Sequence, residues 1–323
     1  MADFRILVIR LSSMGDVIHT LPAAASLKHS FPRSSLSWVV RPQWAALLEG
    51  NPFVDSVVLV ERGFGATLQV VRSLRREPFD LVVDFQGLIQ SAVLAGVVQS
   101  PKKVGLHRSQ ARESLASLFY SSAVITGADH RVERNLELAA AAGATSLLRV
   151  FPLPDGRPEG ALPEGPFVLA SPVAGWGSKQ WPTEYYAELA RGLDVPLVVN
   201  GPPNAEADLS RIAGAHVHVS GIAGLIDATR RASAVVGLDS GPLHLAAALL
   251  KPGIAIYGPT DPSIHGPYGG SIRVMRSDRA VTSYKRSSPE DASMRAIHPE
   301  TVLEALESVL HSPAKYGAAG SPA

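Results

Sequence analysis

The chain has 323 residues, of which 46% are hydrophobic and 18% are charged, and its formal net charge is +1. This length exceeds what one hydrophobic core usually serves, so two domains of about 150 residues each are expected. The near-neutral charge argues against a nucleic-acid-binding protein, and the absence of cysteine excludes disulfides, thiolate catalysis and cysteine zinc sites.

The N-terminal segment contains a short apolar run that ends at Arg10. The run is too short for the core of a signal peptide and far too short to span a bilayer. We therefore expect a cytoplasmic protein. The first half of the chain carries a small excess of basic residues, which is compatible with an anionic acceptor or with peripheral contact at an anionic membrane surface.

Short apolar, β-branched segments alternate with amphipathic segments through the first half of the chain. This rhythm is typical of a parallel sheet covered by helices on both faces, and it predicts a Rossmann-like α/β domain of undetermined strand order. The expected strands are residues 4–10, 36–40, 54–60, 81–85 and 123–126, and the expected helices include 21–29 and 68–76.

Residues 150–166 contain five prolines and several glycines without periodicity, which is typical of an interdomain connector. The alternation of apolar and amphipathic segments begins again after the connector, so the predicted domains are residues 1–152 and 153–311. The second domain's expected strands are residues 167–170, 197–200, 217–220, 234–238 and 254–257, and its expected helices include 183–192 and 243–249.

The last periodic segment, residues 298–310, has apolar residues at helical spacing and a proline in its first turn. We expect this helix to pack on the body of the protein, and the N-terminal domain is one candidate for that contact. Residues 312–323 are small and rich in proline and glycine, which predicts a disordered tail.

The segment Ser12-Ser13-Met14-Gly15-Asp16 follows the first expected strand and precedes a helix. Ligands of open α/β sheets bind at the carboxyl ends of the strands, so this loop is a candidate site. It has neither the glycine spacing of a dinucleotide fingerprint nor the lysine of a P-loop. Asp16 can be a helix cap or a catalytic base, and the two roles are compatible because the surroundings of a cap keep the carboxylate ionised.

Two segments of the second half are candidates for phosphate binding. Residues 239–244 (DSGPLH) lie at the start of a helix, whose free N–H groups can receive a diphosphate. An ordinary capped turn explains that segment equally well. Residues 176–182 (WGSKQWP) contain a glycine, a serine and a lysine that can meet a phosphate, although a solvated surface lysine is the default interpretation.

Several blocks of sequence stand out together, in order, over nearly the whole chain. They are residues 10–22 (RLSSMGDVIHTLP), 84–88 (DFQGL), 111–120 (ARESLASLFY), 179–182 (KQWP), 239–244 (DSGPLH) and 257–262 (YGPTDP). Taken together they resemble the ADP-heptose:lipopolysaccharide heptosyltransferases of glycosyltransferase family 9, heptosyltransferase I above all. Agreement in six separated blocks is far more specific than agreement in any one of them.

The resemblance implies a GT-B fold, in which two Rossmann-like domains face each other across a cleft. It implies an inverting transferase that moves heptose from ADP-heptose onto a Kdo or heptose residue of the lipopolysaccharide inner core. The partners implied are a nucleotide-sugar donor and an anionic glycolipid acceptor. Neither a cofactor nor a metal ion is required by this scheme.

The resemblance also assigns roles by position. Asp16 would deprotonate the acceptor hydroxyl, and Lys179 would neutralise the leaving diphosphate. Ser240 and Gly241 would donate hydrogen bonds to phosphate oxygens. The remaining assignments are donor contacts for Asp239, His244, Ser178 and Glu206, and an acceptor contact for Ser13. Basic residues of the first half could contact acceptor carboxylates or phosphates, because arginine pairs bidentately with such groups. Arg10 and Arg112 are preferred because they lie within the family-like blocks, and Arg62 and Arg108 are weaker candidates.

The sequence departs from the family pattern in the loop PVAGWGS, residues 172–178, because family members usually carry paired threonines near Ala174 and Gly175. Ser178 or the backbone amides of the glycines are expected to substitute. Glu206 is near the position of a ribose-binding acid, although Ala205 aligns slightly better. Donor identity is therefore the least constrained feature.

Three other functions remain open at this point. They are a GT-B transferase or epimerase that uses another nucleotide sugar, a noncatalytic module that binds nucleotide sugars or glycans, and a dinucleotide oxidoreductase. The missing glycine fingerprint counts against the oxidoreductase. Asp16 counts against the noncatalytic module, which has no need of a base.

Overall fold

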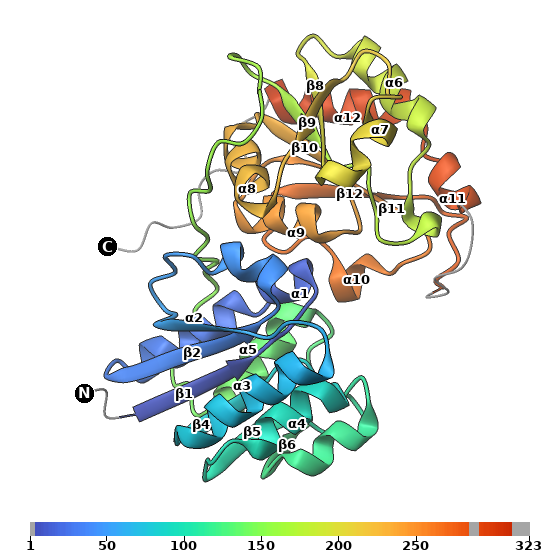
Figure 1. Cartoon of the computed structure of the whole chain (residues 1–323). Coiled ribbons are helices and arrows are strands. Elements are labelled where there is room, and N and C mark those ends of the chain that lie inside the picture. Colours follow the sequence, from blue (N-terminus) through green and yellow to red (C-terminus); the bar gives the residue numbers. More distant parts are fainter. Residues whose placement is uncertain (1–3, 284–290, 312–323) are drawn as a thin grey trace. The chain divides into compact units, whose positions relative to one another are not determined.

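The computed structural model describes residues 4–283 and 291–311. The chain divides into two compact units, Met1–Pro154 and Asp155–Ala323, close to the boundary expected after residue 152. Each unit is a six-stranded parallel sheet with helices packed on it (Figure 1). The tail expected at residues 312–323 lies outside the described residues.

The first unit contains the N-terminal sheet and its helices. Its strands are β1 (Phe4–Ile9), β2 (Ser34–Val40), β3 (Ser56–Leu59), β4 (Leu81–Asp84), β5 (Lys102–Leu106) and β6 (Ser122–Val124), and its helices are α1 (Met14–Ile18), α2 (Leu21–Ser30), η1 (Pro42–Leu47), α3 (Phe64–Arg76), α4 (Ile89–Val97), η2 (Ser114–Phe119) and α5 (Arg131–Ala142). The strand order is β3-β2-β1-β4-β5-β6, and all neighbours are parallel. The loops after β1 and β4 therefore meet at the topological switch point, where open α/β sheets bind ligands.

The strands of the first sheet are apolar because both faces are buried under helices. Leu7 and Ile9 of β1 pack with Leu74 of α3 and Leu94 of α4 on one face. The alternate residues Ile6 and Val8 are also fully buried, and α5, which packs against α2, contacts β4 and β5. The result is a rigid sheet whose carboxyl edge positions the loops.

The second unit repeats this arrangement. Its strands are β7 (Val168–Ala170), β8 (Leu197–Gly201), β9 (His216–Val219), β10 (Ala234–Leu238), β11 (Gly253–Tyr257) and β12 (Ile272–Arg276), and its helices are η3 (Gly177–Lys179), α6 (Thr183–Gly192), η4 (Pro203–Ala205), α7 (Glu206–Leu209), α8 (Ile222–Arg231), α9 (Gly241–Ala248), α10 (Pro262–His265), α11 (Ala292–Arg295) and α12 (Pro299–His311). The order is β12-β11-β10-β7-β8-β9. Counted along this unit it is the same order as in the first, so its switch point lies between β7 and β10.

The last helix, α12, packs on the second unit. Val302, Leu306 and Val309 join the core that contains Trp181 and Tyr186. The Trp181 indole N–H also donates to the Ile297 carbonyl oxygen at 2.8 Å, just before the helix. The apolar face of α12 is thus buried within its own unit, and the N-terminal domain is not needed to cover it.

The connector has neither helix nor strand between residues 150 and 166, as its prolines predict. It is nevertheless attached to the second unit. The Gly221 N–H donates to Glu159 Oε2 at 2.6 Å, and the Arg157 N–H donates to the Ala223 carbonyl oxygen at 3.0 Å. In the part of the chain that the structure describes, no helix is both long and apolar enough to cross a membrane.

The strands β5 and β12 are absent from the sequence prediction, for two different reasons. β5 begins with Lys102 and Lys103, whose ammonium groups reach the carbonyl oxygens of Ala142 and Gly96 at 2.9 and 2.8 Å, so charged residues occupy a strand inside the sheet. β12 is an edge strand whose residues are partly exposed, and arginine occupies two of its five positions.

Candidate active site

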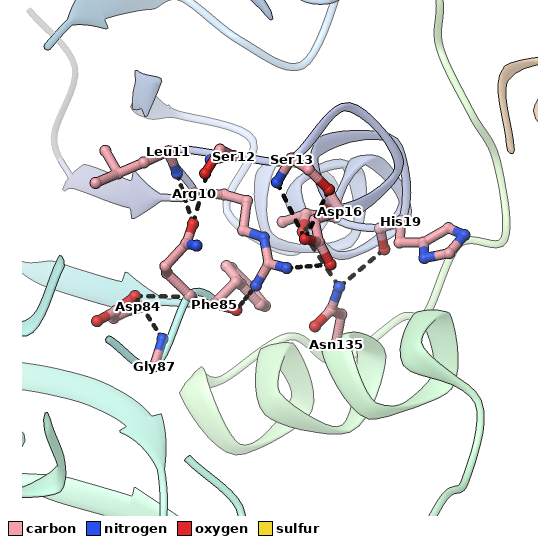
Figure 2. Close-up of polar contacts among 12 residues, drawn as sticks. Arg10, Leu11, Ser12, Ser13, Asp16, His19, Asp84, Phe85, Gly87 and Asn135 are labelled. Carbon is pink, nitrogen blue, oxygen red and sulfur yellow. Dashed lines mark hydrogen bonds and ion pairs between the residues drawn. The ribbon is translucent and has the colours of Figure 1, made fainter. Parts of the chain in front are cut away.

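Asp16 lies in the segment that follows β1, at the switch point of the first sheet (Figure 2). Ser13 is the N-cap of α1, and Asp16 is the third residue of the helix. Asp16 Oδ2 accepts hydrogen bonds from the N–H and the hydroxyl of Ser13, both at 3.0 Å. The carboxylate therefore caps the helix, as the geometry of a capping box requires.

Arg10 holds the other oxygen of this carboxylate. Its guanidinium contacts Asp16 Oδ1 and the Phe85 carbonyl oxygen (Figure 2). The side chain of Arg10 is 5% exposed, whereas that of Asp16 is 21% exposed. The resemblance assigns Arg10 to the acceptor, but the structure buries it against the base, so we interpret it as a positioning residue that leaves part of the carboxylate accessible.

The environment of Asp16 keeps it charged. Burial alone would raise its pKa, but the charge of Arg10, the N–H of Ser13 and the charges of Arg131 and His19 outweigh burial and hold the pKa well below its usual value. The carboxylate is therefore ionised at neutral pH. An ionised carboxylate can accept a proton, so the structure is compatible with the predicted role of Asp16 as a base, which stays a prediction.

The loop after β4 fixes the backbone that leads to Asp16. Gln86 Oε1 accepts the N–H groups of Leu11 and Ser12 at 2.9 and 3.3 Å. The Gln86 N–H in turn donates to Asp84 Oδ1 at 2.8 Å. The DFQGL block, to which the sequence assigns no chemistry, therefore supports the backbone that leads to Asp16.

Asp84 is buried and is itself supported by the ARESLASLFY block. Its Oδ2 accepts the Tyr120 hydroxyl at 2.7 Å and the Ser91 hydroxyl at 2.8 Å. Burial raises the pKa of Asp84 despite these hydrogen bonds. Gly105 makes room for this contact, since a Cβ there would lie 2.3 Å from the Tyr120 ring. Two blocks that are separate in sequence thus form one buried network.

Arg131 is a functional candidate that the sequence analysis missed. It begins α5, and its Nε is buried with no hydrogen-bond partner among the described residues. Burial and the charges of Arg10, Arg134 and Arg112 lower its pKa to about 10, against the opposing charge of Asp16. Arg10 and Arg131 act on the Asp16 carboxylate, and Arg134 and Arg112 act on Arg131. Positive charge therefore exceeds negative charge in this cluster, and an anionic ligand would neutralise the excess.

No sequence block contains Arg131, so the resemblance gave no signal for it. The signal available was topological. Arg131 begins the helix that follows β6, and residues that follow a parallel strand lie at the same edge as the other ligand-binding loops. β6 is an edge strand, and α5 reaches the Asp16 segment because it packs against α2, where Asn135 donates to the His19 carbonyl oxygen and the Thr20 hydroxyl.

In the second unit, the loops after β7 and β10 meet through Lys179 and Asp239. Lys179 Nζ lies 2.5 Å from Asp239 Oδ2 and 4.2 Å from the centre of the Trp176 ring. Burial would raise the pKa of Asp239, but Lys179 and, after it, the charge of His244 hold it below its usual value. His244 Nε2 lies 3.9 Å from Asp239 Oδ1, too far for a hydrogen bond.

Two serine hydroxyls beside this ion pair are free to bind a ligand. Ser178 Oγ and Ser240 Oγ are buried without a hydrogen-bond partner in the described part of the chain. Ser240 is the N-cap of α9, and Gly241 is the first residue of that helix. Gly237 brings the helix close to β10, because a Cβ there would lie 2.7 Å from Leu243. The hydroxyls and the N–H groups of the helix N-terminus are donors of the kind that can bind a phosphate, and that role stays a prediction.

The remaining predicted donor contact, Glu206, lies elsewhere on the second sheet. It begins α7 after β8 and is exposed, whereas Ala205 is buried. Of the two, only Glu206 offers a carboxylate to a ribose. In the loop of residues 172–178, which differs from the family pattern, Ala174 is buried and Gly175 borders open space.

The structure thus brings the predicted residues together in two groups, one in each unit. Arg10, Ser13 and Asp16 form the first group, and Arg112 is linked to it through the charge of Arg131. The second group contains the Lys179–Asp239 pair and the serines beside it. That the two groups face each other across a cleft stays a prediction.

Within residues 4–283 and 291–311, no group of three or more His, Asp or Glu side chains is placed to hold a metal ion. Independence from metal ions stays a prediction.

Comparison with known proteins shows the family of the chain. The model of glycosyltransferase family 9 (heptosyltransferase) matches residues 67–293. The chain is 31% identical to lipopolysaccharide heptosyltransferase 1 of Pseudomonas aeruginosa, over 96% of this chain and 99% of that one. It is similar to the structures of E. coli heptosyltransferase WaaC with ADP and with ADP-2-deoxy-2-fluoro heptose. Their TM-scores are 0.78 and 0.76, and each match has 28% identity and covers 94% of this chain and 99% of that chain.

The Arg10–Asp16 pair predicts a pH-dependent contribution to stability. Since the folded pKa of Asp16 is lowered, the pair stabilises the fold fully above the ordinary carboxylate pKa of about 4, and this contribution is lost as pH falls further. Asp16→Asn is expected to lower the free energy of unfolding by about 3 kcal/mol at neutral pH, and the deficit should shrink in acid. Urea denaturation from neutral pH to about pH 3 measures this, with the exposed Asp278→Asn as control. A deficit that does not change with pH would contradict the assignment.

Proposed function

Since the chain belongs to glycosyltransferase family 9, the heptosyltransferases, we propose that it transfers heptose from ADP-heptose to a Kdo or heptose residue of the lipopolysaccharide inner core, with inversion at the anomeric carbon. The relative in Pseudomonas aeruginosa and the ADP-bound structures of the E. coli enzyme support this substrate class. The observation that carries the proposal is the Asp16 carboxylate, held ionised at the switch point of the first sheet.

In the proposed reaction, an acceptor hydroxyl attacks the anomeric carbon from the side opposite the diphosphate. The new carbon–oxygen bond forms as the bond to the diphosphate breaks, and ADP leaves with the electron pair. Asp16 takes the hydroxyl proton, while Arg10 and Ser13 keep the carboxylate oriented. Such positioned bases typically contribute a factor of about 10² to 10⁴ in rate.

The leaving group gains negative charge as the bond breaks, and the second unit supplies the compensation. Lys179 offers a cation, Ser178 and Ser240 offer hydroxyl donors, and α9 offers its N-terminal N–H groups. Fixed donors of this kind stabilise a transition state by roughly 3 kcal/mol each. Asp239 holds the Lys179 ammonium group in place before the donor binds. Little free energy is then needed to reorient this side chain during the reaction.

The acceptor is proposed to bind at the carboxyl edge of the first sheet. Arg131, with Arg112 and Arg134 nearby, would receive a carboxylate or phosphate of the anionic glycolipid, because guanidinium groups pair bidentately with such groups. The exposed Arg112 would meet the ligand first, and the half-buried Arg131 would fix it beside Asp16. The proposal retains a cytoplasmic enzyme without cofactor or metal requirement.

Asp16→Asn is expected to reduce transfer about 10²- to 10⁴-fold while leaving ADP affinity unchanged, because an amide cannot accept the proton and the donor groups lie in the other unit. Mass spectrometry of the glycosylated acceptor measures transfer, and calorimetry measures ADP binding. Asp278→Asn is the control. Full turnover by the variant would refute the base assignment, and turnover by the wild type only with a different nucleotide sugar would refute the donor.

Lys179→Ala is expected to weaken ADP binding about tenfold or more, because a charge-assisted contact to the diphosphate is lost. Calorimetry measures the affinity, and the exposed Arg191→Ala in the same unit is the control. A thermal-shift comparison of ADP with UDP, GDP and NAD tests nucleotide identity, since a ligand specific to the native state raises the midpoint. Unchanged ADP affinity in the variant would count against a phosphate contact.

Arg131→Gln is expected to raise the KM for an anionic acceptor about tenfold, with a smaller change in kcat and none in ADP affinity, because a charged hydrogen bond to the acceptor is lost. Steady-state kinetics at varied acceptor concentration measure KM and kcat separately, and calorimetry measures ADP affinity. The exposed Arg75→Gln of α3 is the matched control. A fall in kcat with unchanged KM would show that Arg131 acts on the base and not on the acceptor.

A further inference from the structure

An apolar patch on the first unit has no part in the chemistry described above. It consists of Leu115, Leu118 and Phe119 of η2 and Ile89 of α4, with exposed fractions of 59, 78, 38 and 40%. Leu115 and Leu118 lie on the same side of η2, because a 3-10 helix has three residues per turn. Large apolar side chains gathered in this way usually mark an interaction surface. These four residues are called the η2 patch.

The η2 patch is continuous because η2 runs beside α4. At one end, the Ile89 N–H donates to Oε2 of Glu113, the residue before η2, at 2.6 Å. At the other end, a Cβ on Gly96 would lie 2.6 Å from the Phe119 ring. The patch therefore begins at the carboxyl edge of the sheet, where α4 starts, and continues along α4.

Arginines border the η2 patch at that edge. Arg41 donates from Nη2 to Gln90 Oε1 at 3.0 Å, next to Ile89 in the sequence. Arg108 and Arg112 are exposed in the loop that leads from β5 to η2. Apolar side chains with a basic border are the composition of surfaces that lie in the interface of an anionic membrane.

We infer that the η2 patch binds the surface of an anionic lipid bilayer, with the leucines among the headgroups and upper acyl chains and the arginines at lipid phosphates. The inference rests on the proposed function, because a glycolipid acceptor resides in such a bilayer. The patch starts from the same β4–α4 loop whose Gln86 supports the Asp16 segment, so docking brings the base to the membrane surface.

A second copy of the chain is the other occupant to consider for the η2 patch. A twofold dimer would use the same surface on both copies. The arginine borders would then enter one interface with like charges, which opposes association. Lipid phosphates remove that repulsion, so the charge pattern favours the bilayer.

Vesicle co-sedimentation with purified full-length protein tests the inference. Vesicles of phosphatidylethanolamine with phosphatidylglycerol are compared with vesicles of phosphatidylcholine alone, both free of acceptor. The wild type is expected to bind the anionic vesicles, and to bind less as salt rises. The double variant Leu115→Ser/Leu118→Ser is expected to bind about tenfold more weakly, and Arg108→Ser about fivefold. The control Val281→Ser, 78% exposed in the second unit, should bind like the wild type.

Equal binding by the wild type and the leucine variant would overturn the inference, as would equal binding of the wild type to neutral vesicles. Sedimentation velocity that shows a wild-type dimer and a monomeric leucine variant, with vesicle binding unchanged, would assign the patch to a second copy. Transfer to an acyl-free acceptor should be the same for wild type and leucine variant. If the wild type fails to transfer to any acceptor, the proposed function fails while the vesicle result stands.

Discussion

The buried guanidinium of Arg10 is the constraint on which the first half of the site depends. A charge taken out of water has to be paired and hydrogen-bonded, or the fold loses several kcal/mol. Arg10 meets most of this requirement, because its terminal nitrogens contact Asp16 and the Phe85 carbonyl oxygen, while its Nε is buried without a hydrogen-bond partner among the described residues. The same contacts fix the direction of the carboxylate, so a requirement of stability also orients the proposed base.

This constraint extends outward through hydrogen bonds to residues far away in the sequence. Gln86 binds the backbone beside Arg10, Asp84 binds Gln86, and Tyr120 binds Asp84. The first and last of these links join segments that are far apart in the sequence, whereas the bond between Gln86 and Asp84 is local to the end of β4. The blocks that first pointed to a family therefore have a physical reason to occur together, since losing one leaves a buried polar group of the next without its partner.

Most of the fold was predictable from the sequence because its buried strands are continuous apolar runs, as in β1 and β10. β5 was missed because Lys102 and Lys103 extend their ammonium groups out of the sheet to backbone oxygens, which a hydrophobicity pattern cannot reveal. The site was predictable where it lies within sequence blocks, as with Asp16 and Lys179. The burial of Arg10 against the base and the position of Arg131 depend on three-dimensional contacts between segments, and no local pattern encodes them.

On the proposed function, the charges of Arg10 and Arg131 would have opposing effects on catalysis. They keep the carboxylate ionised, but by lowering its pKa they also weaken it as a base. An anionic acceptor held by Arg131 would offset part of that positive charge. The pKa of Asp16 would then rise toward its usual value when the hydroxyl to be deprotonated is in place. On the proposed function, the same electrostatic field attracts the acceptor to the empty site and strengthens the base once the acceptor is bound.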